Sequence, residues 1–220
     1  MQGYIAFGDI PLASKSILFG MDGGGRDLVD SEIEKIISKK GSCTILEIGS
    51  FLGHSTVRWL NFDKRVSVVV SDFFKCTSKV FRSYIDQNVD WATKQFDCCS
   101  RDEIDLILDL FDSPDGHLRL FAANLQPFSD RIKIYQGRFE DNANEIQNNE
   151  SIDMVYLDAD KSDQLLNFVY SRFSSAKLCG DDWNWGPNKG FPMQKAIKSF
   201  ADSNRFLYRA HKATWVIDDV

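Results

Sequence analysis

The 220-residue sequence has no long hydrophobic run, no excess of positive charge and only three histidines. No apolar stretch approaches the roughly 20 residues of a membrane-spanning helix, so we expect no membrane partner. The N-terminal segment lacks a basic region followed by an apolar core and makes a poor secretion signal. The net charge of −6 disfavours a nucleic-acid partner, because phosphate binding usually needs a basic face.

The cysteines fit neither a zinc site nor a disulfide framework. There are five of them, an odd number, and their spacing matches no zinc motif. The adjacent pair Cys98 and Cys99 is unusual, and we interpret it as two reduced thiols. Reduced thiols are typical of the cytosol, so we predict a cytoplasmic protein.

Predicted strands and helices alternate along the chain, which indicates a single α/β domain over residues 1–220. Such alternation favours a mostly parallel sheet with helices on both faces. We expect strands at Thr44–Ile48, Val66–Ser71, Ile132–Gln136, Asp153–Leu157 and Ala176–Gly180, a C-terminal hairpin at Phe206–Ala210 and Thr214–Ile217, and helices at Asp30–Lys39, around His117–Leu125 and at Met193–Ala201.

Two segments extend beyond a minimal α/β domain. Residues 1–25 end in three glycines and are interpreted as a lid, a dimer arm or a packing extension, so a homodimer is one expectation. Residues 73–116 form an insertion rich in aromatic residues, with a predicted amphipathic helix at Arg101–Phe111. Its aromatics form either a small satellite core or a cap over a substrate site.

A glycine turn lies between a predicted strand and a predicted helix in Thr44–Leu60. Glu47, Gly49 and Gly53 follow the spacing E-x-G-x-x-x-G, which differs from the G-x-G-x-x-G of dinucleotide-binding proteins. Glycines let the backbone approach a ligand closely. A carboxylate at the strand end would repel a pyrophosphate, so a cationic or zwitterionic ligand is favoured.

This segment resembles the first motif of the class I S-adenosylmethionine-dependent methyltransferases. The resemblance covers about Glu34 to Val220. It implies a Rossmann-like sheet of seven mostly parallel strands that ends in an antiparallel hairpin. It implies that Asp72 binds the ribose and that the turn after the third strand lies against the adenine. The residues expected at the cofactor are Glu47, Gly49, Ser50, Gly53, Ser55, Thr56, Asp72, Gly137, Arg138 and Phe139. The alternative is an ordinary strand–loop–helix with a structural acid, in which Asp72 caps a turn.

Three carboxylates follow the fourth and fifth predicted strands. Asp158 ends one strand, and Asp181 and Asp182 end the next. Such carboxylates at adjacent strand ends would repel each other without a cation. Oxygen ligands are those that Mg²⁺, Mn²⁺ or Ca²⁺ prefer.

The LDADK segment and this pair of acids resemble metal-dependent O-methyltransferases of the catechol and caffeoyl-CoA type, and sugar O-methyltransferases of the macrocin type. The resemblance implies Asp158, Asp181 and Asp182 as metal ligands, although the caffeoyl-CoA type has asparagine where Asp182 stands. Lys161 is the candidate base, and Asp158 is counted with it as catalytic. Alternatively, Asp158 is structural or binds substrate, the Asp181–Asp182 pair caps a loop, and Lys161 is a surface residue.

The function favoured by these motifs is methyl transfer to a hydroxyl of a small molecule, assisted by a divalent cation. Methylation of nucleic acid or protein is an alternative, but the Asn/Asp-Pro-Pro-aromatic turn of amino-adenine methyltransferases is absent after Leu157. A non-catalytic binding protein and another chemistry on the same fold also remain open. We interpret His54 as a surface residue at a helix start, with a contact to the cofactor carboxylate as the alternative. We interpret His117 as solvated and His211 as structural.

Overall fold

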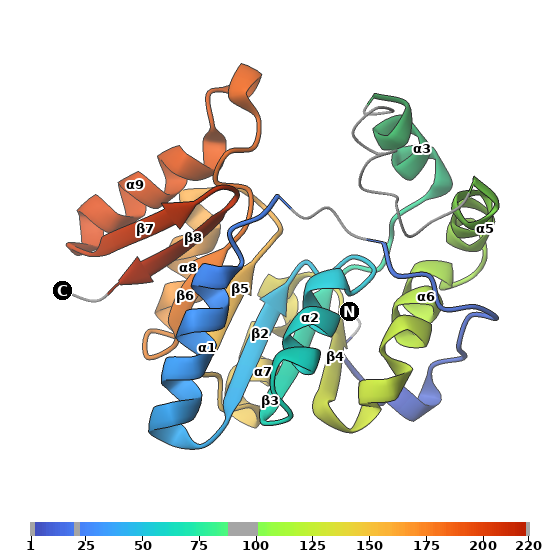
Figure 1. Cartoon of the computed structure of the whole chain (residues 1–220), viewed down its shortest axis with the longest axis horizontal. Helices are drawn as coiled ribbons and strands as arrows, with labels where there is room; N and C mark the ends of the chain where they lie inside the picture. Colours follow the sequence, from blue (N-terminus) through green and yellow to red (C-terminus); the bar gives the residue numbers. More distant parts are fainter. Residues whose placement is uncertain (1–2, 20–22, 88–100, 219–220) are drawn as a thin grey trace.

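The computed structural model describes residues 3–19, 23–87 and 101–218, and it contains a single eight-stranded sheet within them. The sheet is the centre of the molecule in Figure 1. Its strand order is β1-β4-β3-β2-β5-β6-β8-β7. The strands are β1 (Tyr4–Ile5), β2 (Cys43–Ile48), β3 (Val66–Asp72), β4 (Ile132–Gln136), β5 (Met154–Leu157), β6 (Lys177–Gly180), β7 (Leu207–His211) and β8 (Thr214–Asp218).

The predicted α/β class is confirmed, because β2 to β6 run parallel and β7–β8 is an antiparallel hairpin joined to β6 through β8. All seven expected strands are present, each within one residue of its expected bounds. The strand count of seven is wrong by one, since β1 pairs antiparallel with the outer strand β4. β1 is only two residues long, too short to show an alternating pattern.

Helices cover both faces of the sheet, as predicted. Helices α1 (Asp27–Lys40), α2 (His54–Phe62) and α6 (Gly116–Leu125) pack on the face that carries Ile45 and Val68. Helices α7 (Phe139–Asn149), α8 (Asp163–Arg172) and α9 (Pro192–Asn204) pack on the face that carries Leu46 and Val69. The central strands are thus apolar on both sides, as is typical of a buried parallel sheet.

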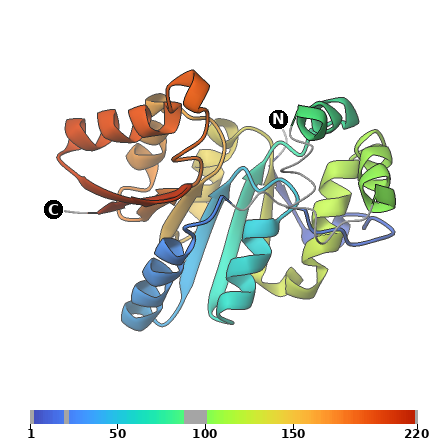
Figure 2. The same ribbon diagram turned by 45° about the horizontal axis from the view of Figure 1, so that its top comes forward.

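The insertion and part of the N-terminal segment form a third, smaller core. Its helices α3 (Ser78–Gln87) and α5 (Arg101–Phe111) lie beside α6, at the end of the molecule away from the β7–β8 hairpin (Figure 1, Figure 2). Phe81 and Phe111 pack there with Phe19 and Leu52. The insertion therefore builds the predicted satellite core, and a capping role stays a prediction. Cys98 and Cys99 lie outside the described residues.

The short 3-10 turns are Phe7–Asp9, Gln126–Arg131 and Pro187–Lys189. Of the helices in the described ranges, none is long and apolar enough to cross a bilayer. Cys43, Cys76 and Cys179 are free thiols.

Candidate functional site

The glycine turn after β2 lies against the end of β5. Gly49 has φ +84°, and a Cβ atom placed on it would lie 2.3 Å from the backbone oxygen of Asp158. The Asp158 amide in turn donates to the Ile48 carbonyl at 2.9 Å. Gly53, also at φ +84°, immediately precedes α2. Only glycine fits the conformation and the space at position 49, because side chains strain the left-handed region.

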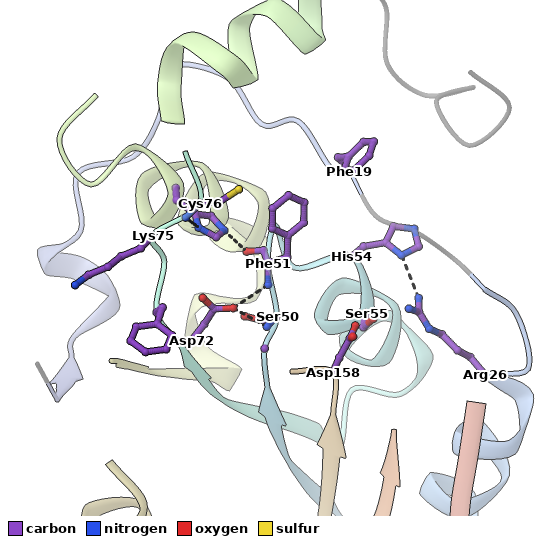
Figure 3. A pocket seen from close by; sticks show the side chains of 13 residues that line it. Phe19, Arg26, Ser50, Phe51, His54, Ser55, Asp72, Lys75, Cys76 and Asp158 are labelled. Atoms are coloured by element: carbon purple, nitrogen blue, oxygen red, sulfur yellow. Dashed lines mark hydrogen bonds between the residues drawn. The ribbon is translucent and has the colours of Figure 1, made fainter. Parts of the chain in front are cut away.

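Asp72, at the end of β3, holds this turn in place. Its Oδ2 accepts hydrogen bonds from the backbone amides of Ser50 at 2.8 Å and Phe51 at 3.0 Å, drawn as dashes in Figure 3. Its Oδ1 accepts from the Phe74 amide at 2.6 Å. The carboxylate thus joins the ends of two adjacent strands. A ribose contact by Asp72 remains a prediction.

Glu47 has a different setting from the one expected of a cofactor ligand. Its side chain is 1% exposed and accepts a hydrogen bond from the Thr56 hydroxyl. Burial raises the pKa of the Glu47 carboxyl to about 8. Two cavities lie at this edge of the sheet, and Glu47, Gly53 and Thr56 line neither of them. These three residues instead connect β2 to α2.

Two cavities open at the carboxyl edge of the sheet and share Gly49, Asp72 and Phe73 as lining residues. The larger, of about 460 Å³, is drawn in Figure 3, where the side chains of Arg26 and His54 point toward each other. It is lined by Phe19, Arg26, Gly49, Ser50, Phe51, His54, Ser55, Asp72, Phe73, Lys75, Cys76, His117 and Asp158. The smaller, of about 400 Å³, is lined by Ile48, Gly49, Ser71, Asp72, Phe73, Gly137, Arg138, Phe139, Glu140, Ala159, Asp160 and Leu165.

These cavities bring together seven of the ten predicted cofactor residues. Gly49, Ser50, Ser55 and Asp72 lie at the larger cavity; Gly137, Arg138 and Phe139 lie at the smaller, which Gly49 and Asp72 also line. The turn after β4 is therefore close to the glycine turn, as the motifs predicted. The Arg138 guanidinium lies 5.8 Å from the centre of the Phe73 ring.

His117 was predicted to be solvated, and this is wrong. It is 4% exposed, because α6 carries it under the insertion. Its Nδ1 accepts from the Cys76 amide at 3.2 Å, which leaves Nε2 to donate to the Phe51 carbonyl at 2.9 Å. Burial lowers the pKa of His117, so the neutral ring holds both bonds. His117 thus joins the glycine turn to the segment after β3.

The three predicted metal ligands lie at the carboxyl ends of β5 and β6, but the chain itself supplies ion-pair partners for two of them. The buried Asp181 forms an ion pair with Arg26, with 3.1 Å between Oδ2 and Nη2. Asp182 forms an ion pair with Lys161, with 2.6 Å between Oδ2 and Nζ. Burial and the charges of Asp181 and Asp182 raise the pKa of Asp158 to about 7.

These residues do not fit the predicted divalent cation. In the described part of the chain, no three His, Cys, Asp or Glu side chains lie in a group that could hold a metal ion. Asp181 and Asp182 are each committed to a cationic side chain. The sequence showed three acids at adjacent strand ends, but not the cations that reach them.

Lys161, the predicted base, donates to the Ala159 carbonyl at 3.0 Å as well as pairing with Asp182. Its Nζ lies 5.0 Å from the centre of the Trp185 ring. It lines neither cavity. The ammonium would have to leave this pair and lose its proton before acting as a base, so that role stays a prediction.

Sequence reasoning missed most of the wall of the larger cavity. Phe19 and Arg26 come from the N-terminal segment. Phe51 lies in the glycine turn, at a position that the E-x-G-x-x-x-G motif leaves unspecified. Phe73, Lys75 and Cys76 begin the insertion. Only the aromatic content of the insertion and the three glycines before Arg26 were signals in the sequence.

The sequence matches no known protein family and no curated protein. Solved structures do match the fold. Rv0187 from MTB, solved with cofactor bound, superposes with a TM-score of 0.56 at 13% identity over 96% of this chain and 85% of that one. The O-methyltransferase TomG from Streptomyces achromogenes, in complex with SAM, superposes with a TM-score of 0.52 at 13% identity, over 86% of this chain and 78% of that one. A Klebsiella pneumoniae protein assigned as an O-methyltransferase superposes with a TM-score of 0.51 at 11% identity, over 94% of this chain and 82% of that one.

The chain has the fold of class I S-adenosylmethionine-dependent methyltransferases. At such low identity this likeness concerns the fold, and the chemistry has to be argued from the site.

Proposed function

We propose that this protein transfers a methyl group from S-adenosylmethionine to a hydroxyl of a small molecule. The observation that carries the proposal is the pair of adjoining cavities at the carboxyl edge of the sheet, which share Gly49, Asp72 and Phe73. The strand order reverses between β2 and β5, and ligands of open α/β sheets bind at such a point. Gly49 and Asp158 lie there.

The nucleoside of the cofactor would occupy the smaller cavity, beside Gly137, Arg138 and Phe139. The amino-acid end would extend past Gly49 into the larger cavity, where backbone can approach it closely. Asp158 would face its positively charged groups, because ammonium and sulfonium both favour a nearby carboxylate. Apart from Asp158, which was predicted as a metal ligand, these are residues that the motifs predicted at the cofactor.

The acceptor would occupy the rest of the larger cavity, whose wall includes Phe19, Phe51 and Phe73. Its hydroxyl oxygen forms the new bond to the methyl carbon as the carbon–sulfur bond breaks. The sulfur keeps that electron pair, and the hydroxyl proton passes to a base or to water. Lys161 remains the candidate for that base. No covalent enzyme intermediate forms, so orientation of the two reactants supplies most of the catalysis.

A small-molecule acceptor is favoured over nucleic acid because the chain carries a net charge of −6. The proposed reaction does not depend on a divalent cation, because two of the three expected ligands, Asp181 and Asp182, are paired with Arg26 and Lys161. Cytoplasmic location and a homodimer remain predictions.

Titration calorimetry with S-adenosylhomocysteine tests the cofactor. We expect saturable binding at one site per chain. An absence of binding to the folded protein would remove the methyltransferase proposal.

A further inference from the structure

Arg26 is a buried cation in the group of acids at the carboxyl edge. Its side chain is 4% exposed, and its Nη2 donates to Asp181 Oδ2 at 3.1 Å. Its Nη1 lies 3.2 Å from Nδ1 of His54, at the start of α2. Arg26 also lines the larger cavity. One guanidinium thus connects the N-terminal segment, the residue after β6 and the glycine-turn helix.

The glycines before Arg26 explain how the chain places it there. Gly25 has φ +90°, and a Cβ atom on it would lie 1.9 Å from the His211 carbonyl oxygen. The Gly24 carbonyl accepts from the Thr214 hydroxyl at 3.1 Å. The segment therefore lies directly against the β7–β8 hairpin. A larger residue would hold it away and withdraw Arg26 from the site.

The same hairpin places the acid that Arg26 meets. The Trp215 indole donates to the backbone carbonyl of Asp181 at 2.9 Å. Arg26 and Asp181, 155 residues apart in sequence, are thus both held by β8 and its turn. The hairpin therefore positions both partners of this ion pair.

The positive charge of Arg26 acts on three acids, of which Glu47 and Asp181 are buried. Burial raises the pKa values of Glu47, Asp158 and Asp181, and the charge of Arg26 offsets part of this rise. The remaining acid, Asp182, is paired with Lys161. Each acid of the predicted metal set therefore has a cationic side chain acting on it.

We infer that Arg26 takes the place of a divalent cation in this site and supplies the positive charge beside the acceptor. The inference about the acceptor rests on the proposed function. A metal ion that bound Asp181 would have to displace Arg26 and leave a buried guanidinium without its carboxylate partner, which is strongly unfavourable. Arginine keeps its charge at any working pH and holds a carboxylate in fixed geometry, so it suits a permanent role.

The decisive experiment is a titration of the full chain with Mn²⁺, followed by electron paramagnetic resonance. We expect no saturable Mn²⁺ site in the wild-type protein, with or without S-adenosylhomocysteine. We also expect the S-adenosylhomocysteine affinity to change less than about twofold in excess EDTA. A saturable Mn²⁺ site that Asp181→Asn removes would overturn the inference, whereas one that survives this change lies elsewhere and leaves it standing.

Thermal unfolding of Arg26→Gln gives a second measurement. This variant leaves the acids uncompensated, so its unfolding midpoint should fall, and 1 mM Mn²⁺ should raise it again by about 3 °C or more while leaving the wild type unchanged. Arg58→Gln is the matched control, because Arg58 pairs with Asp30 on the surface. It should behave as the wild type. An Arg26→Gln midpoint equal to that of the wild type would contradict the inference.

If Arg26→Gln does not fold, the wild-type and Asp181→Asn titrations still decide the question. The outcome is also separable from the proposed function. A wild-type protein that binds neither Mn²⁺ nor S-adenosylhomocysteine would keep Arg26 as the compensating charge and remove the methyltransferase proposal.

Discussion

The backbone amide of Ser50 donates a 2.8 Å hydrogen bond to the carboxylate of Asp72 and so joins the glycine turn after β2 to the end of β3. Asp72 lines both cavities, and Ser50 lines the larger one. Any ligand in contact with the turn therefore depends on Asp72, whether or not it touches the carboxylate itself.

Asp72→Ala should weaken S-adenosylhomocysteine binding by about 1–3 kcal/mol, or roughly 5- to 150-fold, as expected for loss of charge-assisted hydrogen bonds. Calorimetry measures this directly. Asp130→Ala is the control, because Asp130 is exposed in the turn before β4. Equal affinity in the two variants would show that Asp72 is not part of the cofactor site.

Gly49→Ala should both destabilise the fold and block the cofactor. Gly41 is a matched control, because it has φ +89° with nothing within 4 Å of an added Cβ, whereas the Cβ at Gly49 would meet the Asp158 backbone oxygen at 2.3 Å. Gly41→Ala should cost about 1–2 kcal/mol from backbone strain alone. Gly49→Ala should cost about 1–3 kcal/mol more in urea unfolding. Equal destabilisation by the two substitutions would mean that the turn shifts to make room for the Cβ atom at position 49.

Glu47→Gln should make stability less dependent on pH. The folded protein keeps a proton on Glu47 up to about pH 8, whereas the unfolded chain releases it near 4.5. Wild-type stability is therefore highest relative to the variant below pH 4.5, and falls as pH rises toward 8, by at most about 1.4 kcal/mol per pH unit. Urea unfolding between pH 5 and 8 measures the difference.

Glu34→Gln serves as its control, because Glu34 is exposed on α1. Its free energy of unfolding should change with pH in the same way as that of the wild type. If that of Glu47→Gln does so too, Glu47 is ionised in the folded protein.

His117→Ala should destabilise the protein by about 1–3 kcal/mol, because the Cys76 amide and the Phe51 carbonyl both lose a buried partner. His211→Ala, at the exposed hairpin, should change stability by less than about 0.5 kcal/mol. Since the pKa of His117 is lowered by folding, wild-type stability should fall as pH drops below about 6.5. A His117→Ala variant with the same acid-induced loss would assign that loss to other groups.

Lys161→Ala should reduce turnover about 10²- to 10⁴-fold if this lysine is the general base. S-adenosylhomocysteine affinity should stay unchanged, because Lys161 pairs with Asp182 and is not among the residues assigned to the cofactor. Lys161→Arg should not restore activity, since a guanidinium keeps its proton. Product S-adenosylhomocysteine formed with a panel of hydroxyl compounds is the readout. Normal turnover by the alanine variant would leave Lys161 as the partner of Asp182 alone.

Local sequence patterns predict the sheet and the position of the site on it. The apolar runs at β2, β3 and β5 are local patterns, and parallel strands bring Gly49, Asp72 and Asp158 to one edge without further information. The strand β1 could not be predicted, because two residues carry no period.

The electrostatics of the site depend on contacts that form only in the folded chain. Arg26 reaches Asp181 across 155 residues of sequence because both pack against the β7–β8 hairpin, and His117 is buried because the insertion folds over α6. A sequence shows which residues end each strand, but a charge is neutralised by whatever lies nearest in space. In the sequence, the three acids suggested a metal site. In the fold, Asp181 pairs with Arg26 and Asp182 pairs with Lys161.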